Sequence, residues 1–429
     1  MTDDVIGLGF SDRVLTDAET EDVVSRSLDA AALYNQRVLV IIPDGTRTAP
    51  IPLFFRLVGE YLRGRVGALD YLVALGTHTL MSDDALLRHV GVRADELATL
   101  YPGVGIYNHR WDLSETFVSV GSLPADETAR LSGGRVAVDV DVRINRMVLE
   151  YDVIIIVGPV FPHEVVGFSG GNKYFFPGIG GAEVINFTHW LGALITNREV
   201  IGAGYTPVRA VIDRAASLVQ RRKLCFSLVV SDRGLHGVYV GSPEASWREA
   251  SRLSARVHVR YFDRPFERVL ALIPEMYPDM WTGAKGMYKT EPVLADGGEV
   301  VLHAPHVERT SYVHGHHLDD IGYHVRDYFL AQWDRFKQVP WGVLAHSTHV
   351  RGSGTYEEGR EWPRVQVTFA TQIPQELCSR LNVGYRAPGS IRLEEWKDRE
   401  DDGFLVVPHA GQVLYRLRAP DELETTEPG

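Results

Sequence analysis

The sequence is poor in cysteine, in long apolar runs and in positive charge, and each shortage argues against a class of protein. Only two cysteines, Cys225 and Cys378, occur among 429 residues, and their separation fits neither a disulfide framework nor a metal-ligand motif. The longest apolar stretch, at residues 153–161, is too short to span a bilayer. Lysine and arginine number 44 against 56 aspartates and glutamates, and the resulting net charge of −12 disfavours binding to nucleic acid or to anionic membranes.

The first residues of the sequence are acidic and show neither the basic nor the apolar region of a secretory signal. We therefore expect a soluble protein of the cytoplasm, with both cysteines reduced and buried as small apolar side chains. Histidine, by contrast, is plentiful, with 16 residues. Because imidazole binds metals and transfers protons near neutral pH, the positions of the histidines guide the search for a site.

Short apolar runs alternate with amphipathic segments along the first half of the chain. Continuous apolar strands between such segments are typical of parallel sheets that helices cover on both faces. Buried strands are predicted at residues 38–42, 71–75 and 153–157, and a helix at residues 21–34. Ser82 is a candidate N-cap for a further helix that runs through Leu86 and Leu87.

A second alternation begins near residue 265. It predicts a helix at residues 280–294, a turn at 295–298, and strands at 269–273, 299–303, 342–345, 365–369 and 404–407. We expect an α/β fold of two domains with mainly parallel sheets, one formed by residues 1–264 and the other by residues 265–429, with a frayed acidic tail after Ala419. Ligands of parallel sheets sit beyond the carboxyl ends of the strands, so the active site is expected in the cleft between the domains.

A glycine-rich segment at residues 162–181 follows the strand predicted at 153–157 and contains a single lysine, Lys173. Small residues let backbone N–H groups approach an anion, and a lysine adds a point charge, so the segment suggests a nucleotide. Its spacing fits neither the GxxxxGK[ST] pattern nor GxGxxG. A glycine-rich turn with a surface lysine explains the composition equally well.

Three histidines accompany this segment. His163 precedes Lys173 by ten positions, His189 follows it by sixteen, and His78 comes directly after the strand predicted at 71–75. A lone histidine is usually structural, but three that follow strands or flank one loop point to a site. Their spacing matches no zinc signature such as HExxH.

Taken together, these motifs resemble the nickel-dependent lactate racemase family. The order and separation of five elements carry the resemblance: Pro43-Asp44-Gly45-Thr46-Arg47, Gly76-Thr77-His78, Pro162-His163, Gly167-Phe168-Ser169-Gly170-Gly171-Asn172-Lys173 and His189. The resemblance is strong up to about residue 190 and weaker over residues 265–305. The Phe-Ser-Gly-Gly-x-Lys loop with a histidine ten positions earlier is its most specific part.

The resemblance implies a nickel pincer nucleotide, that is, pyridinium-3-thioamide-5-thiocarboxylic acid mononucleotide holding Ni. Lys173 corresponds to the lysine that tethers it through the thioamide, and His189 to the histidine that completes the nickel site. His78 and His163 correspond to the acid and base, and Arg47 to a residue that acts on the substrate. Further cofactor-binding positions implied by the resemblance are Asp44, Thr46, Ser169, Gly170, Gly171 and Lys285.

These residue types suit the implied reaction, the racemisation or epimerisation of a small 2-hydroxy acid. Loss of a hydride from the α-carbon requires loss of the hydroxyl proton, which a neutral histidine can accept. A second histidine on the opposite face of the planar keto acid allows return with inverted configuration. Arg47 or Lys285 can hold the carboxylate. The implied partners are the 2-hydroxy acid and the cofactor-synthesis enzymes that load the protein.

Some positions depart from the family pattern and leave alternatives open. Thr79 stands where an arginine is frequent, and Trp281 and Thr282 stand where a tyrosine and a glutamine are expected. The substrate can therefore be larger than lactate or differently charged. A redox or elimination step on a sugar acid, and a non-catalytic protein that binds the cofactor, are the alternative functions.

Two other polar segments admit more than one interpretation. Residues 108–112 are interpreted as a surface loop rather than as part of the site. The histidine-rich residues 314–317 are interpreted as a loop near the substrate rather than as a separate metal cluster.

Overall fold

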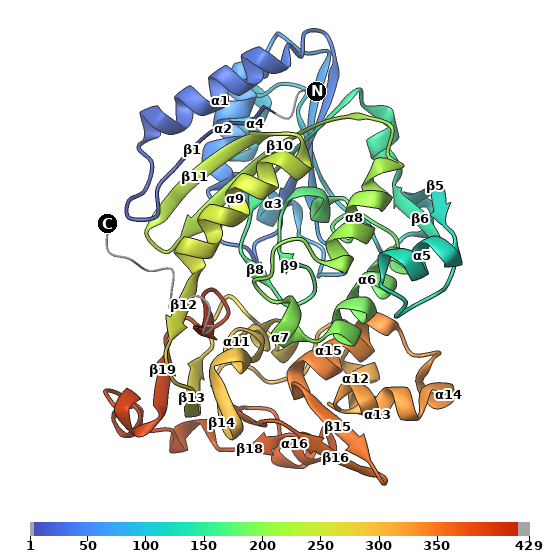
Figure 1. Cartoon of the computed structure of the whole chain (residues 1–429). Coiled ribbons are helices and arrows are strands. Elements are labelled where there is room, and N and C mark those ends of the chain that lie inside the picture. The colour runs from blue at the N-terminus through green and yellow to red at the C-terminus, as the bar shows by residue number, and fades with distance from the viewer. Residues whose placement is uncertain (1–3, 419–429) are drawn as a thin grey trace. The chain divides into compact units, whose positions relative to one another are not determined.

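The computed structural model describes residues 4–418, which divide into two compact units (Figure 1). The first unit comprises the described residues up to Phe161 together with Phe168–Thr188 and Gly204–Val257. The second comprises Pro162–Gly167, His189–Ala203 and the described residues from His258 onward. The main division after Val257 lies close to the boundary predicted after residue 264. The tail after Ala419 lies outside the described residues.

The first unit is built on a seven-stranded sheet with the order β1-β11-β10-β7-β2-β3-β4. The strands from β10 to β4 are parallel, while β11 and β1 run antiparallel at one edge. The bounds are β1 (Ile6–Gly9), β2 (Arg37–Pro43), β3 (Ala68–Ala74), β4 (Gly105–Asn108), β7 (Val153–Pro159), β10 (Arg222–Ser231) and β11 (Gly234–Gly241). The strands predicted at 38–42, 71–75 and 153–157 are confirmed, because β2, β3 and β7 cover them almost completely.

Helices cover both faces of this sheet (Figure 1). Apolar side chains of α1 and α2 pack against one face, whereas Trp247, Ala250 and Leu253 of α9 pack against the other. The helices are α1 (Asp17–Ala31), α2 (Ile51–Leu62), α3 (Asp83–Val90), α4 (Ala94–Leu100), α5 (Ala125–Leu131), α8 (Pro207–Ser217) and α9 (Pro243–His258). Ser82 caps α3 as predicted, because its Oγ accepts a hydrogen bond from the N–H of Ala85 at 3.3 Å. A short ladder of β5 (Phe117–Leu123) with β6 (Val140–Asn145) accompanies the sheet. A second short ladder, β8 (Pro162–His163) with β9 (Gly167–Phe168), belongs to the second unit except for Phe168.

The second unit is built on a five-stranded, fully parallel sheet with the order β18-β17-β14-β13-β19. Its strands are β13 (Phe266–Leu272), β14 (Leu294–Ala304), β17 (Gln366–Thr371), β18 (Gly384–Tyr385) and β19 (Phe404–Val407). A short parallel pair is formed by β12 (Val259–Phe262) and β20 (Leu414–Leu417), and an antiparallel hairpin by β15 (Gly354–Glu357) and β16 (Arg360–Pro363). The helices of this unit are α7 (Asn197–Val200), α10 (Met280–Gly283), α11 (Lys285–Tyr288), α12 (Gly315–Ile321), α13 (Arg326–Ala331), α14 (Trp333–Phe336), α15 (Trp341–Arg351) and α16 (Gln375–Arg380). The chain passes from the first unit into the second along α6 (Ala182–Ile195).

Three predictions for the second unit are wrong. The helix predicted at 280–294 is broken into α10, α11 and a 3-10 turn at Glu291–Val293, where Pro292 lacks the N–H that a longer helix would need. The turn predicted at 295–298 lies inside the continuous strand β14. The strand predicted at 342–345 belongs to α15, in which every residue from Val343 to Arg351 is buried. A short apolar run does not distinguish a buried helix from a buried strand.

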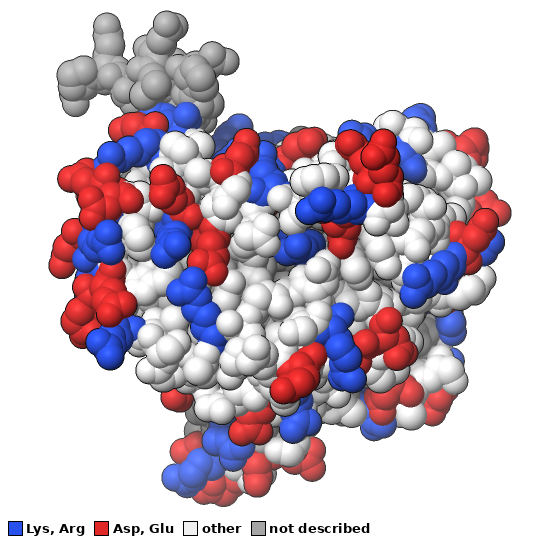
Figure 2. Space-filling model, turned by 90° about the horizontal axis from the view of Figure 1, so that it is seen from below, with Lys and Arg blue, Asp and Glu red and all other residues white. Residues whose placement is uncertain are grey.

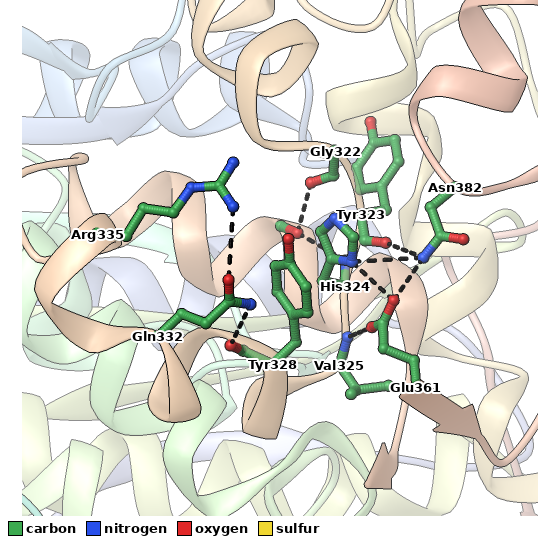
Figure 3. Close-up of polar contacts among 10 residues, drawn as sticks. Gly322, Tyr323, His324, Val325, Tyr328, Gln332, Arg335, Glu361 and Asn382 are labelled. Atoms are coloured by element: carbon green, nitrogen blue, oxygen red, sulfur yellow. Dashed lines mark hydrogen bonds and ion pairs between the residues drawn. The ribbon is translucent and has the colours of Figure 1, made fainter. Parts of the chain in front are cut away.

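A polar network joins the hairpin β15–β16 to the rest of the second unit (Figure 3). The carboxylate of Glu361 lies 2.7 Å from Nδ1 of His324 and accepts hydrogen bonds from Nδ2 of Asn382 and from the N–H of Val325, both at 2.8 Å. The ring of Tyr328 stacks on His324 with a centroid distance of 3.8 Å. Because this carboxylate on β16 binds groups from two other segments, residues 324–325 and Asn382, the network stabilises the packing of the unit.

The surface shown in Figure 2 carries acidic and basic side chains side by side rather than in fields of one sign. None of the helices within residues 4–418 combines the length and the apolar character needed to cross a membrane. Both cysteines are buried and free, as predicted.

Candidate active site

The first unit brings together three loops that the sequence singles out. Asp44, Thr46 and Arg47 follow β2, His78 follows β3, and the glycine-rich segment follows β7. These three strands are neighbours in the order β7-β2-β3 and run parallel, so their carboxyl ends lie at one edge of the sheet. The expectation that these polar loops gather at a sheet edge is confirmed for the first unit.

A carboxylate–histidine pair stands at this edge. Nδ1 of His78 lies 2.5 Å from Oδ2 of Asp44, whose Oδ1 accepts hydrogen bonds from the N–H of Thr46 at 3.1 Å and from its hydroxyl at 2.7 Å. Trp111 anchors the backbone of this loop, because its Nε1–H donates to the carbonyl of His78 at 2.7 Å. The pair thus holds the imidazole with Nδ1 facing the carboxylate and Nε2 on the far side of the ring.

Asp44 is ionised in this setting. Burial by itself raises the pKa of its carboxyl, but the charge and hydrogen bond of His78, the charge of Arg47 and the hydrogen bond of Thr46 outweigh burial and lower it below the ordinary value. The ionised Asp44 accepts a hydrogen bond from Nδ1–H of His78. When the imidazole has no second proton, its lone pair is therefore on Nε2.

Arg47 lies on the same loop as Asp44 and is partly exposed. Its guanidinium carbon is 5.5 Å from the centre of the Phe161 ring. Among residues 4–418 this guanidinium makes neither a hydrogen bond nor an ion pair, so its donors are available to an anion from solution.

Lys173 lies in η3 (Gly171–Tyr174), a 3-10 turn that contacts β2, β7 and α8. Its carbonyl accepts a hydrogen bond from the N–H of Gly178 at 3.1 Å, and the carbonyl of Gly178 accepts one from the N–H of Gly76 at 2.9 Å. These two bonds connect the lysine loop to the loop of His78. Lys173 is partly exposed, whereas its neighbours Asn172 and Tyr174 are buried.

Arg209 and Trp247, which the sequence analysis missed, bind backbone carbonyls of the loop that precedes Lys173. Arg209 donates from Nη1 to the carbonyl of Gly170 at 3.0 Å and from Nη2 to the carbonyl of Phe168. Nε1–H of Trp247 donates to the carbonyl of Ser169 at 2.9 Å, and the guanidinium lies 4.3 Å from the centre of the Trp247 ring. Burial lowers the pKa of Arg209 to about 10, so it stays charged at neutral pH. The sequence signal that could have identified Arg209 is its position between apolar residues of α8 that face the core.

The small residues before Lys173 have internal roles in this structure. Gly170 and Gly171 have φ angles of 83° and 59°, and a Cβ on Gly170 would lie 2.5 Å from Cγ2 of Val160. The hydroxyl of Ser169 donates to the carbonyl of Pro159 and accepts from the N–H of Phe161, both at 3.1 Å. Direct binding of a cofactor by these three residues stays a prediction.

The second unit contains the other two predicted histidines. His163 is buried on β8, and its Nδ1 accepts a hydrogen bond from the N–H of Val165 at 3.2 Å while lying 3.4 Å from Oε2 of Glu164. Because Nδ1 accepts that bond, the neutral ring carries its proton on Nε2. His189 lies on α6 and is partly exposed. Lys285 begins α11, with Nζ 4.4 Å from the centre of the Tyr277 ring.

An aromatic group of the second unit surrounds His346, which the sequence analysis also missed. Its ring stacks on Trp281 with a centroid distance of 3.9 Å, and the other neighbour of Trp281 is His314 at 4.6 Å. Nδ1 of His346 lies 2.8 Å from the hydroxyl of Tyr288. Burial, followed by the charges of His349, His314 and His189, lowers the pKa of His346 well below its ordinary value.

Both ambiguous polar segments take part in packing. The interpretation of 108–112 as a surface loop holds for Arg110 and Asp112, which are exposed. It fails for His109, which is fully buried and pairs with Asn145 at 3.1 Å, while Trp111 contacts the loop of His78. The histidine-rich segment is not simply a loop, because Gly315 begins α12, and its first histidine, His314, contacts Trp281.

Comparison with known proteins finds a family model that matches the first part of the chain and two related proteins. Residues 13–202 match the family model of the lactate racemase N-terminal domain. The lactate racemase of Thermoanaerobacterium thermosaccharolyticum is 25% identical over 185 residues, which cover 39% of this chain and 38% of that protein. The lactate racemase of Lactiplantibacillus plantarum is 23% identical over 297 residues, which cover 65% of this chain and 62% of that protein. The matched region thus spans less than two thirds of either relative.

Solved structures resemble the chain over nearly its whole length. A structural-genomics crystal structure of a protein from Thermotoga maritima has a TM-score of 0.88 at 29% identity and covers 96% of this chain and 100% of that one. The lactate racemase apoprotein from Thermoanaerobacterium thermosaccharolyticum has a TM-score of 0.71 at 17% identity, with 92% of each chain covered, and it shares the fold. The region matched by the family model contains the Asp44–His78 pair, Lys173 and the two further histidines, and in this region the chain is similar to the lactate racemase N-terminal domain.

Proposed function

We propose that this protein is an isomerase that racemises or epimerises a small 2-hydroxy acid with a nickel pincer nucleotide tethered to Lys173. The observation that carries the proposal is the Asp44–His78 pair, joined by backbone hydrogen bonds to the loop of Lys173. The two curated relatives named above are lactate racemases, which supports the reaction class.

The residues present fit such a cofactor. A tethering lysine and a metal-binding imidazole must both be reachable, and Lys173 and His189 are partly exposed among buried neighbours. A Cβ placed on Gly45 or on Gly76 would meet no atom within 4 Å, so the loops beside the Asp44–His78 pair border open space. We propose that Lys173 holds the group covalently and that His189 binds its nickel. When bound, the group supplies reversible acceptance of a hydride, which amino-acid side chains do not offer.

The two proposed acid–base histidines have complementary hydrogen-bonding states. Nε2 of His78 carries a lone pair and can accept the hydroxyl proton of the substrate, while Asp44 stabilises the imidazolium that forms. Nε2–H of His163 can donate a hydrogen bond to the oxygen on the second carbon. His163 acts as the acid once its ring has taken up a second proton, so that giving up one proton leaves a neutral imidazole. For the opposite enantiomer the two histidines exchange these roles.

Arg47 is the proposed ligand of the substrate carboxylate. Its guanidinium is not engaged by other residues in the described chain and can bind a carboxylate through two hydrogen bonds. Lys285, from the second unit, is proposed to add a second positive charge to the same substrate.

Mass spectrometry of the peptide that contains Lys173 tests the tether. The protein is to be produced together with the cofactor-synthesis enzymes, because only such cells can load it. The expected result is a modified Lys173 with nickel in the intact protein, and an unmodified peptide in Lys173→Arg. Lys397→Arg, at an exposed lysine far along the chain, is the matched control and should keep the modification. An unmodified Lys173 without nickel would refute the proposal.

Chiral chromatography then tests the reaction on the loaded protein. Single enantiomers of several 2-hydroxy acids and sugar acids are incubated with it, and formation of the opposite configuration supports isomerisation. A dehydrated or oxidised product would show instead a redox or elimination reaction. Tight cofactor binding without any turnover would identify a carrier protein.

A further inference from the structure

The second unit contains a cavity of about 390 Å³. This volume lies within the range of about 300–1,000 Å³ that is typical of ligand pockets. The residues that line the cavity come from α6, α7, α13 and α15, from the 3-10 turn at Glu291–Val293 and from the segment after α15, and all of them belong to the second unit. None of the residues assigned above to the proposed reaction is among them.

Asn197 lines this cavity and has an amide oxygen without a partner. Its Nδ2 donates to the carbonyl of Tyr288 at 3.0 Å and to Oε2 of Glu291 at 2.9 Å. Because both partners are acceptors, they fix the orientation of the amide and leave Oδ1 as the remaining atom. The residue is 3% exposed, and among residues 4–418 its Oδ1 has no hydrogen-bond partner. A buried acceptor is rarely left in this state in a native protein, so it indicates a missing donor.

Glu291, next to Asn197 in the lining, is a fully buried carboxylate without a cation. Its Oε1 accepts a hydrogen bond from the N–H of Ser353 at 2.7 Å, and its Oε2 accepts the one from Asn197. Hydrogen bonds donated to both oxygens favour the ionised form. Within the described chain no lysine, arginine or histidine forms an ion pair with this carboxylate, and Arg364 donates to the backbone carbonyl of Glu291 instead. Since a buried charge with only neutral partners is costly, the cavity favours a ligand that brings a positive charge.

The ring of His349 supplies a third polar group. The residue is 4% exposed, and in the part of the chain that the structure describes its Nε2 has no hydrogen-bond partner. Burial lowers the pKa of His349 to about 4, so the ring is neutral at neutral pH and one of its nitrogens carries a lone pair. The ring lies 5.7 Å from that of Tyr288, whose carbonyl binds Asn197. A Cβ on Gly352, three residues after His349, would lie 3.0 Å from Oε1 of Glu291, so the end of α15 adjoins the carboxylate.

The backbone at Thr196 gives a second, independent observation on the same cavity. Thr196 lines the cavity and has a φ angle of 99°, at which a β-branched side chain is an outlier. Such a conformation costs free energy and persists only where the surrounding structure enforces it, and residues of this kind gather at ligand sites. The strain and the unpaired polar atoms therefore mark the same place.

We propose that this cavity binds the primary ammonium group of a small amine or amino acid, whose N–H groups donate to Oδ1 of Asn197, the carboxylate of Glu291 and Nε2 of His349. An alkylammonium group carries one positive charge and three donors but no acceptor, which matches three acceptors with one negative charge. A metal ion matches less well, because residues 4–418 contain no group of three or more His, Cys, Asp or Glu that could hold one. The proposed site is separate from the proposed reaction and does not depend on it.

The remaining lining residues leave room for the rest of the ligand. The cavity is more than ten times larger than the roughly 30 Å³ that a water molecule, similar in size to an ammonium ion, occupies in the liquid. Small residues, among them Ala193 and Gly354, line part of it and admit a short carbon chain. Arg198 also lines the cavity, is exposed and forms no ion pair with any described residue, so its guanidinium is available to the carboxylate of an amino acid.

Calorimetric titration of the full-length protein with four matched compounds tests the proposal. Propylammonium is the simple amine, and L-2-aminobutyrate adds a carboxylate to it. Propyltrimethylammonium keeps the positive charge but has no N–H group, and potassium chloride supplies a bare cation. We expect one or both primary ammonium compounds to bind, and the trimethyl compound to bind at least about tenfold more weakly, because it cannot donate to the three acceptors. A preference for L-2-aminobutyrate that Arg198→Gln abolishes would support an amino acid as the ligand.

Two matched variants connect binding with the buried carboxylate. Glu291→Gln removes the negative charge but keeps the shape, and its new amide N–H can bond with Oδ1 of a rotated Asn197, so binding should weaken by at least about tenfold. Glu199→Gln removes an equal charge from an exposed residue of the same lining and should change the affinity by less than about threefold. If Glu291→Gln does not fold, His349→Phe, which replaces the imidazole by a ring of similar size, should still weaken binding by about tenfold.

Several results would overturn the proposal. Binding of neither primary ammonium compound would leave only water in the cavity, and a response to potassium chloride alone would make it a metal-ion site. Equal binding of the trimethyl compound, or equal losses in Glu291→Gln and Glu199→Gln, would reduce the effect to unspecific attraction of cations. Because these titrations need neither cofactor nor turnover, they are repeated on protein without the nickel cofactor, and their outcome is independent of the proposed isomerase activity.

Discussion

Two histidines of this protein, one in each unit, are held at Nδ1 by partners of opposite character. In the first unit the ionised Asp44 accepts a hydrogen bond from Nδ1–H of His78, which leaves a lone pair on Nε2 of the neutral ring. In the second unit Nδ1 of His346 lies 2.8 Å from the hydroxyl of Tyr288, and burial raises the pKa of this phenol well above its ordinary value. When the phenol donates to Nδ1, the neutral ring of His346 carries its proton on Nε2. The same side chain is thereby prepared as a base in one place and as a donor in the other. The partner at Nδ1, rather than the histidine itself, decides which chemistry is available.

The histidine of the first unit should show the largest effect on turnover. His78→Gln keeps a polar side chain but cannot carry a proton, so kcat is expected to fall by about 10⁴-fold, the upper range for loss of a general base. Steady-state kinetics on loaded protein measures this change. His409→Gln, at an exposed histidine, provides the control. A loss below tenfold would remove His78 from the acid–base pair.

Asp44→Asn tests whether the partner at Nδ1 decides the role of His78. The substitution replaces a carboxylate, which only accepts a hydrogen bond from Nδ1–H, by an amide, which can also donate one to Nδ1. The wrong tautomer should then place a proton on Nε2 of His78, and kcat should fall by about 10³-fold while KM changes little.

The Asp44→Asn variant should also change acid stability. The pKa of Asp44 is lowered in the folded protein, so its stabilising effect is complete above the ordinary value of 3.8 and is lost as the pH falls below it. Denaturation of the two proteins from pH 7 to pH 2 measures this, and parallel curves would contradict it.

The buried histidines of α15 should make the second unit sensitive to mild acid. Burial lowers the pKa of His349 to about 4 from an ordinary value of 6.5, so the unfolded chain takes up a proton first as the pH falls. Stability should therefore be full above pH 6.5 and decline by roughly 3 kcal/mol by pH 4 for this residue alone. Urea denaturation at several pH values should show a shallower decline for His349→Phe. An equally steep decline in the variant would mean that other groups are responsible.

A substitution in the network around Glu361 should have the smallest effect on activity (Figure 3). This network stabilises the packing of the second unit and contains none of the proposed catalytic residues. Asn382→Ala removes two hydrogen-bond donations, to Glu361 at 2.8 Å and to the carbonyl of Tyr323 at 3.1 Å. Stability should fall by about 1–2 kcal/mol, while the kinetics of inversion stay within twofold. Thermal unfolding and the chiral assay together test this. A large loss of activity without a loss of stability would assign the network a part in the reaction.

The site could be predicted from sequence where its residues lie in short, contiguous motifs. Asp44, Thr46 and Arg47 follow one continuous apolar strand, and His78 follows the next, so the rule for parallel sheets was sufficient to bring them together. Arg209 and Trp247 could not be assigned to the same loop, because they reach it from helices that lie 34 or more residues further along the chain. Neither belongs to a motif.

The sequence alone determined β2, β3 and β7 of the first unit, β13, β14, β17 and β19 of the second, and the loops that follow β2, β3 and β7, because continuous apolar runs and adjacent polar residues are local properties. Only the tertiary structure decided which histidines are paired, and with what. Tyr288 and His346 are 58 residues apart, and the helix that carries His346 was predicted as a strand. Hydrogen bonds between such distant residues depend on how the helices and strands pack, and no periodic pattern in the sequence predicts which of them come into contact.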